Sequence, residues 1–151
     1  MGISLSYSKD KMLADEITND SFIKFFGSIK KFDDFQSVKA WLRRITVNTA
    51  IDYFRKQKKF KNQTDISEET SVFHEVNALQ DLAFQDILNL LNLLSEDHKM
   101  VFNLYEIEGY SHKEIGEKLG LTESSSRVYL ARAKAQLRDF VSLHLKEYEG
   151  R

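Results

Sequence analysis

The 151-residue sequence contains no cysteine and no proline, and it has only six glycines. Without cysteine the chain cannot form disulfides, use a thiol nucleophile or hold a cysteine-ligated zinc or iron–sulfur site. Few glycines and no prolines are unusual for a sheet protein with tight turns and fit a helical one. No apolar run approaches the roughly 18 residues of a membrane helix, and residues 1–6 lack the charged and apolar regions of a secretory signal. We therefore expect a cytoplasmic protein without membrane insertion.

Residues that would indicate catalysis are also missing. The sequence has neither a glycine-rich phosphate loop nor a nucleophile elbow. The four histidines, His74, His98, His112 and His144, are not spaced four residues apart, as two ligands on one helix face would be. We therefore predict that the protein is not an enzyme, that it has no metal or cofactor, and that its histidines carry no function.

The total charge is balanced, but its distribution along the chain is not. The sequence has 22 Lys and Arg against 23 Asp and Glu, a net charge of −1. Residues 24–61 hold eleven of the bases and only three of the acids, whereas residues 62–110 hold one base and ten acids. A block this basic favours a polyanionic partner such as nucleic acid, although a solvated helix face would carry the same residues.

Hydrophobic residues in the first part of the chain recur at the spacing of helices. This spacing predicts one helix from about Leu13 to Ile29 and another from Val38 to Phe54. Ser37 is a candidate N-cap for the second of these helices. The segment 30–36 between them is predicted to be a loop.

Two further helices are predicted after a linker. Residues 62–79 show little periodicity and predict a flexible linker. The chain from Leu82 to Leu94 has helical spacing, and Ser95 is a candidate N-cap of a following helix. The buried face of that helix is predicted to carry Met100, Val101, Leu104 and Ile107. We therefore predict an all-α protein with two small helical domains, at residues 1–61 and 80–151, joined by the linker.

The most specific motif lies between residues 109 and 138. Ser111 and Glu114 have the spacing of a capping box, in which the serine closes the first helical turn and the glutamate bonds back. Gly120 follows the last apolar residue of this helix, where a left-handed residue lets the chain turn. Thr122 is placed to cap a second helix. These signals together predict a helix-turn-helix.

The outward face of the second helix of this motif is suited to DNA. Its first turn carries small hydroxyl residues, which allow a phosphate to approach the positive end of the helix dipole. Its next turns carry arginines that can reach a base edge or a phosphate. The candidate DNA-binding residues are Ser124, Ser125, Arg127, Val128 and Arg132. The alternative is a helical hairpin whose basic face is only solvated.

Two sets of residues resemble one known family. The stretches from Val101 to Tyr105 and from Gly109 to Ile115, with the helix pair that follows, look like region four of the extracytoplasmic-function (ECF) sigma factors of the sigma-70 family. Residues 14–22 are similar to the acidic helix of region two in that family. Further matches to region two follow in the order Phe35, Trp41, Leu42, Ile45, Asn48, Ala50, Ile51, Asp52, Tyr53 and Arg55.

The resemblance implies a subunit that directs bacterial core RNA polymerase to promoter DNA. It assigns Asp15, Asn19, Asp20 and Phe22 to the polymerase clamp, and the helix-turn-helix to the minus-thirty-five promoter element. The minus-ten element would contact a basic helix and the loop before it, which contribute Lys39, Arg43, Arg44, Asn48, Arg55, Lys56, Phe32 and Phe35. Melted DNA exposes unpaired bases, which cations and aromatic rings bind. The two loop phenylalanines are the better candidates for a flipped base, because the spacing of Phe25, Trp41 and Phe54 is typical of a core.

The start of the sequence departs from the family pattern. Family members have about two more helices before the acidic helix, whereas only about eleven residues precede it here. The face that carries Ile17, Phe22 and Phe26 is then expected to be exposed, covered by residues 1–11 or covered by another protein. The chain therefore resembles an ECF sigma factor that is truncated at the N-terminus of region two.

Two other functions fit the same residues. One is a two-domain helix-turn-helix regulator that binds duplex DNA without polymerase. The other is a truncated, sigma-like decoy that occupies an anti-sigma protein and starts no transcription. The expected partners are therefore promoter DNA and core RNA polymerase, with an anti-sigma factor as a further candidate.

Overall fold

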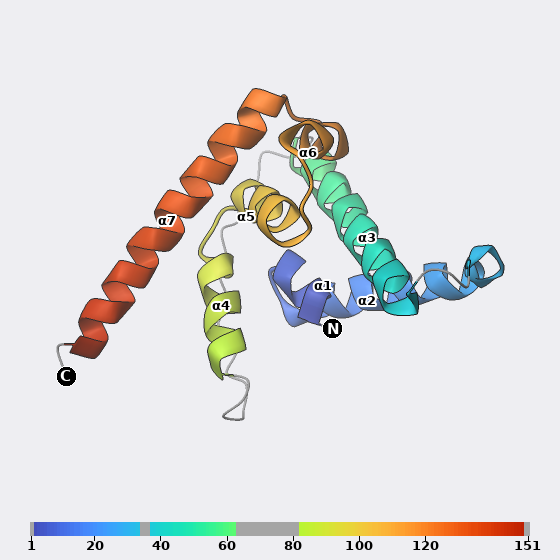
Figure 1. Cartoon of the computed structure of the whole chain (residues 1–151), viewed down its shortest axis with the longest axis horizontal. Helices are drawn as coiled ribbons and strands as arrows, with labels where there is room; N and C mark the ends of the chain where they lie inside the picture. Colours follow the sequence, from blue (N-terminus) through green and yellow to red (C-terminus); the bar gives the residue numbers. More distant parts are fainter. Residues whose placement is uncertain (1, 34–36, 63–81, 150–151) are drawn as a thin grey trace. The chain divides into compact units, whose positions relative to one another are not determined.

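The described chain is helical throughout its regular elements. The structure is a computed structural model that describes residues 2–33, 37–62 and 82–149, with the backbone alone for residues 82, 83 and 144–149. Every element in these residues is a helix or a helical turn, which confirms the predicted all-α fold (Figure 1). None of the helices in the described residues is both long and apolar enough to cross a membrane.

Contacts between Cα atoms divide the chain into two compact units. The N-terminal unit is Met1–Val72 and the C-terminal unit is Phe73–Arg151. Apart from Asn62, the predicted linker at 62–79 lies outside the described residues. The domain boundaries at 1–61 and 80–151 therefore stay predictions.

The described part of the N-terminal unit has four elements. They are α1 (Gly2–Tyr7), α2 (Lys11–Gly27), the 3₁₀ turn η1 (Ile29–Lys31) and α3 (Val38–Lys61). The Asp10 carboxylate caps α2 by accepting a hydrogen bond from the backbone N–H of Leu13 at 2.8 Å. Ser37 stands at the N-cap of α3, as predicted, but within the described residues its hydroxyl accepts no capping hydrogen bond.

Helix α1 packs on both longer helices of this unit. Its hydrophobic residues alternate with polar ones, a pattern typical of a strand, so the sequence does not predict it. The hydroxyls of Ser4 in α1 and Thr18 in α2 are hydrogen-bonded at 2.7 Å, and Ala14 and Ile17 of α2 are fully buried. Helix α1 therefore covers the first part of the α2 face, which agrees with one of the three outcomes expected for it, cover by residues 1–11.

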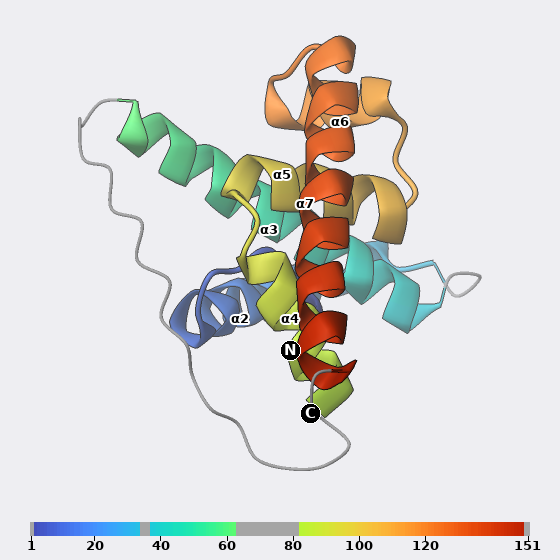
Figure 2. The same ribbon diagram turned by 90° about the vertical axis from the view of Figure 1, so that its left-hand side faces the viewer.

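The C-terminal unit is built along one long helix. It contains α4 (Leu82–Asn92), α5 (Glu96–Phe102), the π-helical turn η2 (Asn103–Ile107), α6 (His112–Leu119) and α7 (Glu123–Glu149). Helices α4, α5 and α6 each contact α7, which runs past them in Figure 2. Its core includes Leu91 and Leu94 packed against Ala133, with Phe102 and Leu137 beside them.

The turn η2 corrects one expectation about the buried face of this unit. Three of the four residues predicted for that face are buried, namely Met100, Val101 and Leu104. Ile107 is instead 48% exposed. In η2 the backbone N–H of Glu108 donates to the carbonyl of Asn103, five residues back instead of four, at 3.0 Å. The extra residue rotates the following chain by about 100° relative to the helical stripe, so Ile107 leaves the buried face.

The helix-turn-helix consists of α6, a short turn and the start of α7. The predicted capping box is present: Ser111 Oγ accepts from the N–H of Glu114 at 3.2 Å, and the Glu114 carboxylate accepts from the N–H of Ser111 at 2.8 Å. Gly120 ends α6 with a φ of 69°, in the predicted left-handed region. The Thr122 hydroxyl accepts from the N–H of Ser125 at 3.0 Å and caps α7, as predicted.

Substitution of Gly116 tests how closely this turn packs on α6. A Cβ at Gly116 would lie 2.6 Å from the backbone oxygen of Leu121, so the turn must shift to admit it. We expect Gly116→Ala to lower the free energy of unfolding of the C-terminal unit by about 1–3 kcal/mol, the usual cost of overpacking. Urea unfolding and hydrogen exchange in α6 and α7 measure this change.

The matched control is Gly27→Ala at the end of α2, where a Cβ would meet nothing within 4 Å. Because alanine favours helix more than glycine does, this variant should be neutral or more stable by less than about 1 kcal/mol. Equal losses of stability in the two variants would contradict the close approach at Gly116.

Candidate nucleic-acid interface

The first turns of α7 present most of the residues predicted to bind DNA. Four of the five are exposed, namely Ser124, Arg127, Val128 and Arg132. The fifth, Ser125, is half-buried, and its hydroxyl accepts a hydrogen bond from the Thr122 hydroxyl at 2.8 Å. The exposed residues place a small hydroxyl in the first turn of α7, at the positive end of its dipole, and two cations in the following turns. Such a surface can bind a phosphate and reach a base edge.

The cations of α7 differ in their partners. Arg127 Nη2 donates to the carboxylate of Glu123, one helical turn earlier, at 2.5 Å. The two side chains are 63% and 49% exposed, so the pair adds little to stability. Lys134 pairs with Glu106 of η2. Arg132 has no carboxylate partner among the residues that the structure describes.

His112, to which the sequence analysis assigned no function, holds α6 against α7. The residue is buried, its Nδ1 lies within hydrogen-bond distance of Ser126 Oγ at 2.9 Å, and its ring stacks on Tyr105 with centroids 4.4 Å apart. Burial, followed by the charge of Arg127, lowers the pKa of His112 below its ordinary value of 6.5. A single histidine on a helix gives no sequence pattern, so only the fold reveals this partner.

Helix α3 carries the second group of predicted DNA-binding residues. Arg44, Asn48 and Arg55 are exposed and follow one side of the helix by their spacing, and we call them the α3 stripe. Asp52 lies on the same side, and its carboxylate pairs with Lys24 of α2 at 3.3 Å. The other predicted residues of this helix are Lys39 and Lys56, which are exposed, and Arg43, which is half-buried.

The loop phenylalanines predicted to meet a flipped base lie before α3. Phe32 is half-buried, and its ring centroid is 5.1 Å from that of Trp41. The Trp41 ring also contacts Phe25 at 4.9 Å, so these rings form one aromatic cluster. A base can stack on Phe32 only at the part of the ring that Trp41 leaves exposed. Phe35 lies outside the described residues.

The four residues predicted to bind polymerase divide into two groups on α2. Asp15, Asn19 and Phe22 are spaced by four and three residues, so they follow one side of the helix, and we call them the α2 stripe. Asn19 and Phe22 are exposed, and Asp15 is half-buried. Asp20 faces α3 instead, where its carboxylate accepts a hydrogen bond from the Tyr53 hydroxyl at 2.6 Å.

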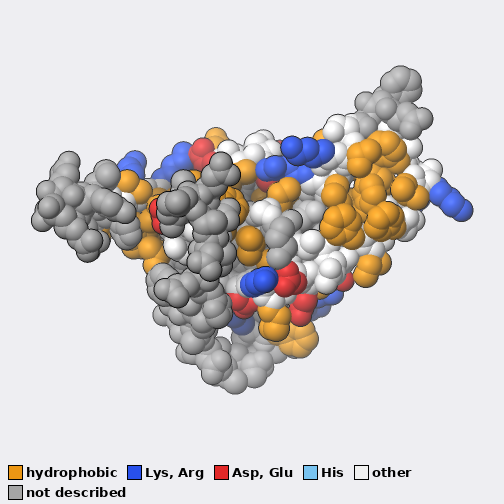
Figure 3. Space-filling view, turned by 90° about the horizontal axis from the view of Figure 1, so that it is seen from below, with side chains coloured by type: hydrophobic (Ala, Val, Ile, Leu, Met, Phe, Trp, Pro, Cys, Tyr) orange, Lys and Arg blue, Asp and Glu red, His pale blue; other side chains and the backbone are white. Residues whose placement is uncertain are grey.

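An apolar patch continues from the α2 stripe. Phe22, Ile23 and Phe26 of α2 and Ile29 of η1 are 44–70% exposed. The rings of Phe22 and Phe26 stack with centroids 6.4 Å apart. Figure 3 shows hydrophobic side chains gathered over this end of α2. Unlike the Ile17 part of the face, this part is exposed, and a contiguous exposed patch is typical of an interaction surface.

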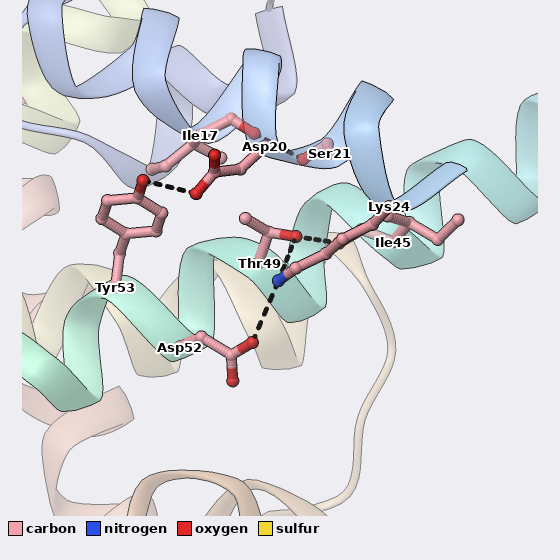
Figure 4. A network of polar contacts seen from close by, with 8 residues as sticks. All are labelled: Ile17, Asp20, Ser21, Lys24, Ile45, Thr49, Asp52 and Tyr53. Atoms are coloured by element: carbon pink, nitrogen blue, oxygen red, sulfur yellow. Dashed lines mark hydrogen bonds and ion pairs between the residues drawn. The ribbon is translucent and has the colours of Figure 1, made fainter. Parts of the chain in front are cut away.

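Two groups of polar contacts join α2 to α3 (Figure 4). In the first, the Tyr53 phenol donates to the Asp20 carboxylate, and this bond raises the pKa of Tyr53 to about 12. In the second, Lys24 Nζ donates to the Thr49 hydroxyl at 3.2 Å and to the Asp52 carboxylate at 3.3 Å. These contacts fix the position of the α2 stripe along α3.

The Tyr53–Asp20 hydrogen bond should stabilise the N-terminal unit measurably. We expect Tyr53→Phe and Asp20→Asn each to lower the free energy of unfolding of this unit by about 1 kcal/mol. A buried hydrogen bond to a charged acceptor contributes somewhat more than this, and solvent screening reduces the contribution here. The double variant should lose less than the sum. Fluorescence of Trp41, the single tryptophan, reports the unfolding of this unit.

Asp52→Asn provides the comparison, since it removes an exposed ion pair between the same two helices. Its effect should stay below about 0.5 kcal/mol. Strict additivity of the Tyr53 and Asp20 substitutions would show that the two side chains do not interact.

The stability of the C-terminal unit should fall in mild acid through His112. Because folding lowers the pKa of His112, the unfolded chain binds the proton more readily, so stability is complete above pH 6.5 and decreases below it. We expect the urea midpoint, followed by hydrogen exchange in α6, to decrease between about pH 7.5 and about pH 5.5. His112→Gln, which does not titrate, should show a smaller decrease. Equal decreases would assign the pH dependence to another group.

Two family models match the chain, one in each unit. The model of Sigma-70 region 2 matches residues 1–60, which include the α2 stripe and the α3 stripe. The model of Sigma-70, region 4 matches residues 84–137, which include the helix-turn-helix. The two models therefore follow one another in the order that the resemblance implied.

Two solved structures are similar to the chain in fold. One is the sigma factor RpoE from Bartonella quintana in complex with the anti-sigma factor NepR, with a TM-score of 0.57, 24% identity, and coverage of 93% of this chain and 88% of that chain. The other is CnrH in complex with the cytosolic domain of CnrY, with a TM-score of 0.55, 22% identity, and coverage of 93% of this chain and 79% of that chain.

Curated relatives are also similar to the chain in sequence, over most of this chain and most of their own length. The chain is 26% identical to the RNA polymerase sigma factor SigZ of Bacillus subtilis, over 87% of this chain and 74% of that protein. It is 30% identical to the ECF RNA polymerase sigma factor SigM of the same organism, over 89% of this chain and 83% of that protein. With both region models matched in order, the chain belongs to the ECF sigma factors of the sigma-70 family.

Proposed function

We propose that the protein binds core RNA polymerase in the cytoplasm and directs it to promoters as an alternative sigma factor, with no catalysis of its own. Membership of the sigma factor family supports this class of function. One observation carries the proposal: the α2 stripe and the α3 stripe stand on two helices that side-chain contacts hold together. One small unit can therefore hold a protein on α2 and DNA on α3 at the same time.

In this proposal the α2 stripe contacts the polymerase clamp. Asp15 and Asn19 supply polar groups, and the exposed ring of Phe22 supplies an aromatic anchor of the kind that dominates the energetics of many interfaces. Asp20 acts indirectly, because its carboxylate is engaged by Tyr53. Asp20 is then a positioning residue for the polymerase contact.

Each unit contacts a different part of the promoter in this proposal. The α3 stripe binds the minus-ten element together with Lys39, Arg43 and Lys56, and the loop residues Phe32 and Phe35 offer rings to unpaired bases. The start of α7 reads the minus-thirty-five element through Ser124, Ser125, Arg127, Val128 and Arg132. Lysine and arginine release counterions when they bind phosphate, so added salt should weaken both contacts steeply.

An anti-sigma protein is a second proposed partner. Both of the similar solved structures were determined with a bound protein, which is an anti-sigma factor in one of them. The apolar patch of Phe22, Ile23, Phe26 and Ile29 offers such a partner a surface on the N-terminal unit. Because the patch shares Phe22 with the α2 stripe, an anti-sigma protein seated there would compete with polymerase.

Capture of purified bacterial core RNA polymerase by the immobilised chain tests the proposal. The wild-type chain should retain the core enzyme. The double variant Asp15→Ala/Asn19→Ala should retain it at least about tenfold more weakly, because the loss of central interface residues costs more than about 1.4 kcal/mol.

The matched control is Asn89→Ala/Glu117→Ala, which removes one amide and one carboxylate from exposed positions of the C-terminal unit. This control should bind core as the wild type does. If the wild-type chain binds duplex DNA but retains no core enzyme, the two-domain regulator that works without polymerase is the better reading.

A further inference from the structure

The first turn of α7 contains an acid that the proposed contacts do not use. Glu123 is the first residue of α7, directly after the capping residue Thr122, where the helix dipole favours a carboxylate. Its Oε1 also accepts the hydrogen bond from Arg127 Nη2 at 2.5 Å. Both side chains are exposed, so the pair stands on the surface that would face DNA.

A carboxylate at this position opposes phosphate binding. Backbone phosphates of any sequence are attracted to the N-terminus of a helix and to arginine. Glu123 lies at that N-terminus and already accepts one hydrogen bond from Arg127. A phosphate must therefore approach a negative charge, so Glu123 weakens the sequence-independent part of binding.

The same pair prepares Arg127 for a base edge. A guanidinium has five N–H donors in a planar fork, so the bond to Glu123 leaves donors for the two acceptors of a guanine. Because the carboxylate holds the plane of the fork before binding, less side-chain freedom is lost when a base is bound. Glu123 therefore favours a matching base over a phosphate as the ligand of Arg127.

We propose that Glu123 is a specificity-determining residue that acts through Arg127, an inference that rests on the proposed promoter recognition. Glu123 raises the ratio of specific to non-specific DNA affinity by restraining Arg127 in the free protein. Arg132 has no carboxylate partner in the described part of the chain, so no such restraint acts on it.

Binding of two duplexes by the full chain in complex with core polymerase tests this role. One duplex is the sequence that the wild-type complex enriches most from a random pool, and the other has the same bases in scrambled order. Glu123→Gln keeps the size of the side chain and removes its charge. We expect Glu123→Gln to bind the scrambled duplex about three- to tenfold more tightly and to lower the enriched-to-scrambled affinity ratio by a similar factor, as one close charge interaction at a surface predicts.

Two controls separate this role from a general effect of charge. In the Arg127→Ala background, Glu123→Gln should change the affinity ratio by less than about twofold, because without Arg127 the charge of Glu123 acts alike on the phosphates of both duplexes. Glu117→Gln makes the same charge change at an exposed position of α6, and it should also change the ratio by less than about twofold.

Three results would overturn the proposal. An unchanged ratio in Glu123→Gln, an equal fall in the Arg127→Ala background, or an equal fall in Glu117→Gln would each do so. In all three cases promoter selection by the wild type, and with it the proposed function, would stand. If the wild-type complex enriches no sequence at all, the proposed function fails, and this inference fails with it.

Discussion

The N-terminal unit depends on one constraint, the fixed position of α2 along α3. The bond from Tyr53 to Asp20 and the contacts of Lys24 with Thr49 and Asp52 set this position. Apolar side chains find new neighbours when helices slide, whereas directional hydrogen bonds are lost after a shift of one turn, about 5.4 Å. The α2 stripe and the α3 stripe therefore stay in one fixed arrangement. A protein on α2 and a nucleic acid on α3 can then bind the unit at the same time.

In the C-terminal unit, backbone geometry determines how the helices pack. The left-handed Gly120 and the absence of a side chain at Gly116 let the turn fold closely over α6. The neutral ring of His112 then reaches Ser126 on α7. These contacts settle which side of α7 is buried, and they leave Arg127 outside, where it contacts Glu123 instead of the core.

Local chemistry was predictable from the sequence, and distant partners were not. The capping box, Gly120 and Thr122 act within three or four residues, so their spacing alone identifies them. Tyr53 and Asp20 are 33 residues apart and His112 and Ser126 are 14 apart, so only the fold brings each pair together. Hydrophobic and polar residues alternate in α1 as they do in a strand, but the segment is a helix because it packs on α2 and α3. Helical spacing predicted that Ile107 is buried, but the extra residue in the π-helical turn moves Ile107 off the buried face.

The central claim is that one chain both holds polymerase and selects a promoter. Sequencing the 5′ ends of transcripts that purified core polymerase makes on fragmented bacterial DNA, with and without the chain, tests it most directly. We expect start sites that appear only with the chain and that are preceded by two sequence elements at a fixed spacing, because in the proposed function each unit contacts one element. If the chain binds core and no chain-dependent start sites appear, this claim is wrong and the sigma-like decoy becomes the better explanation.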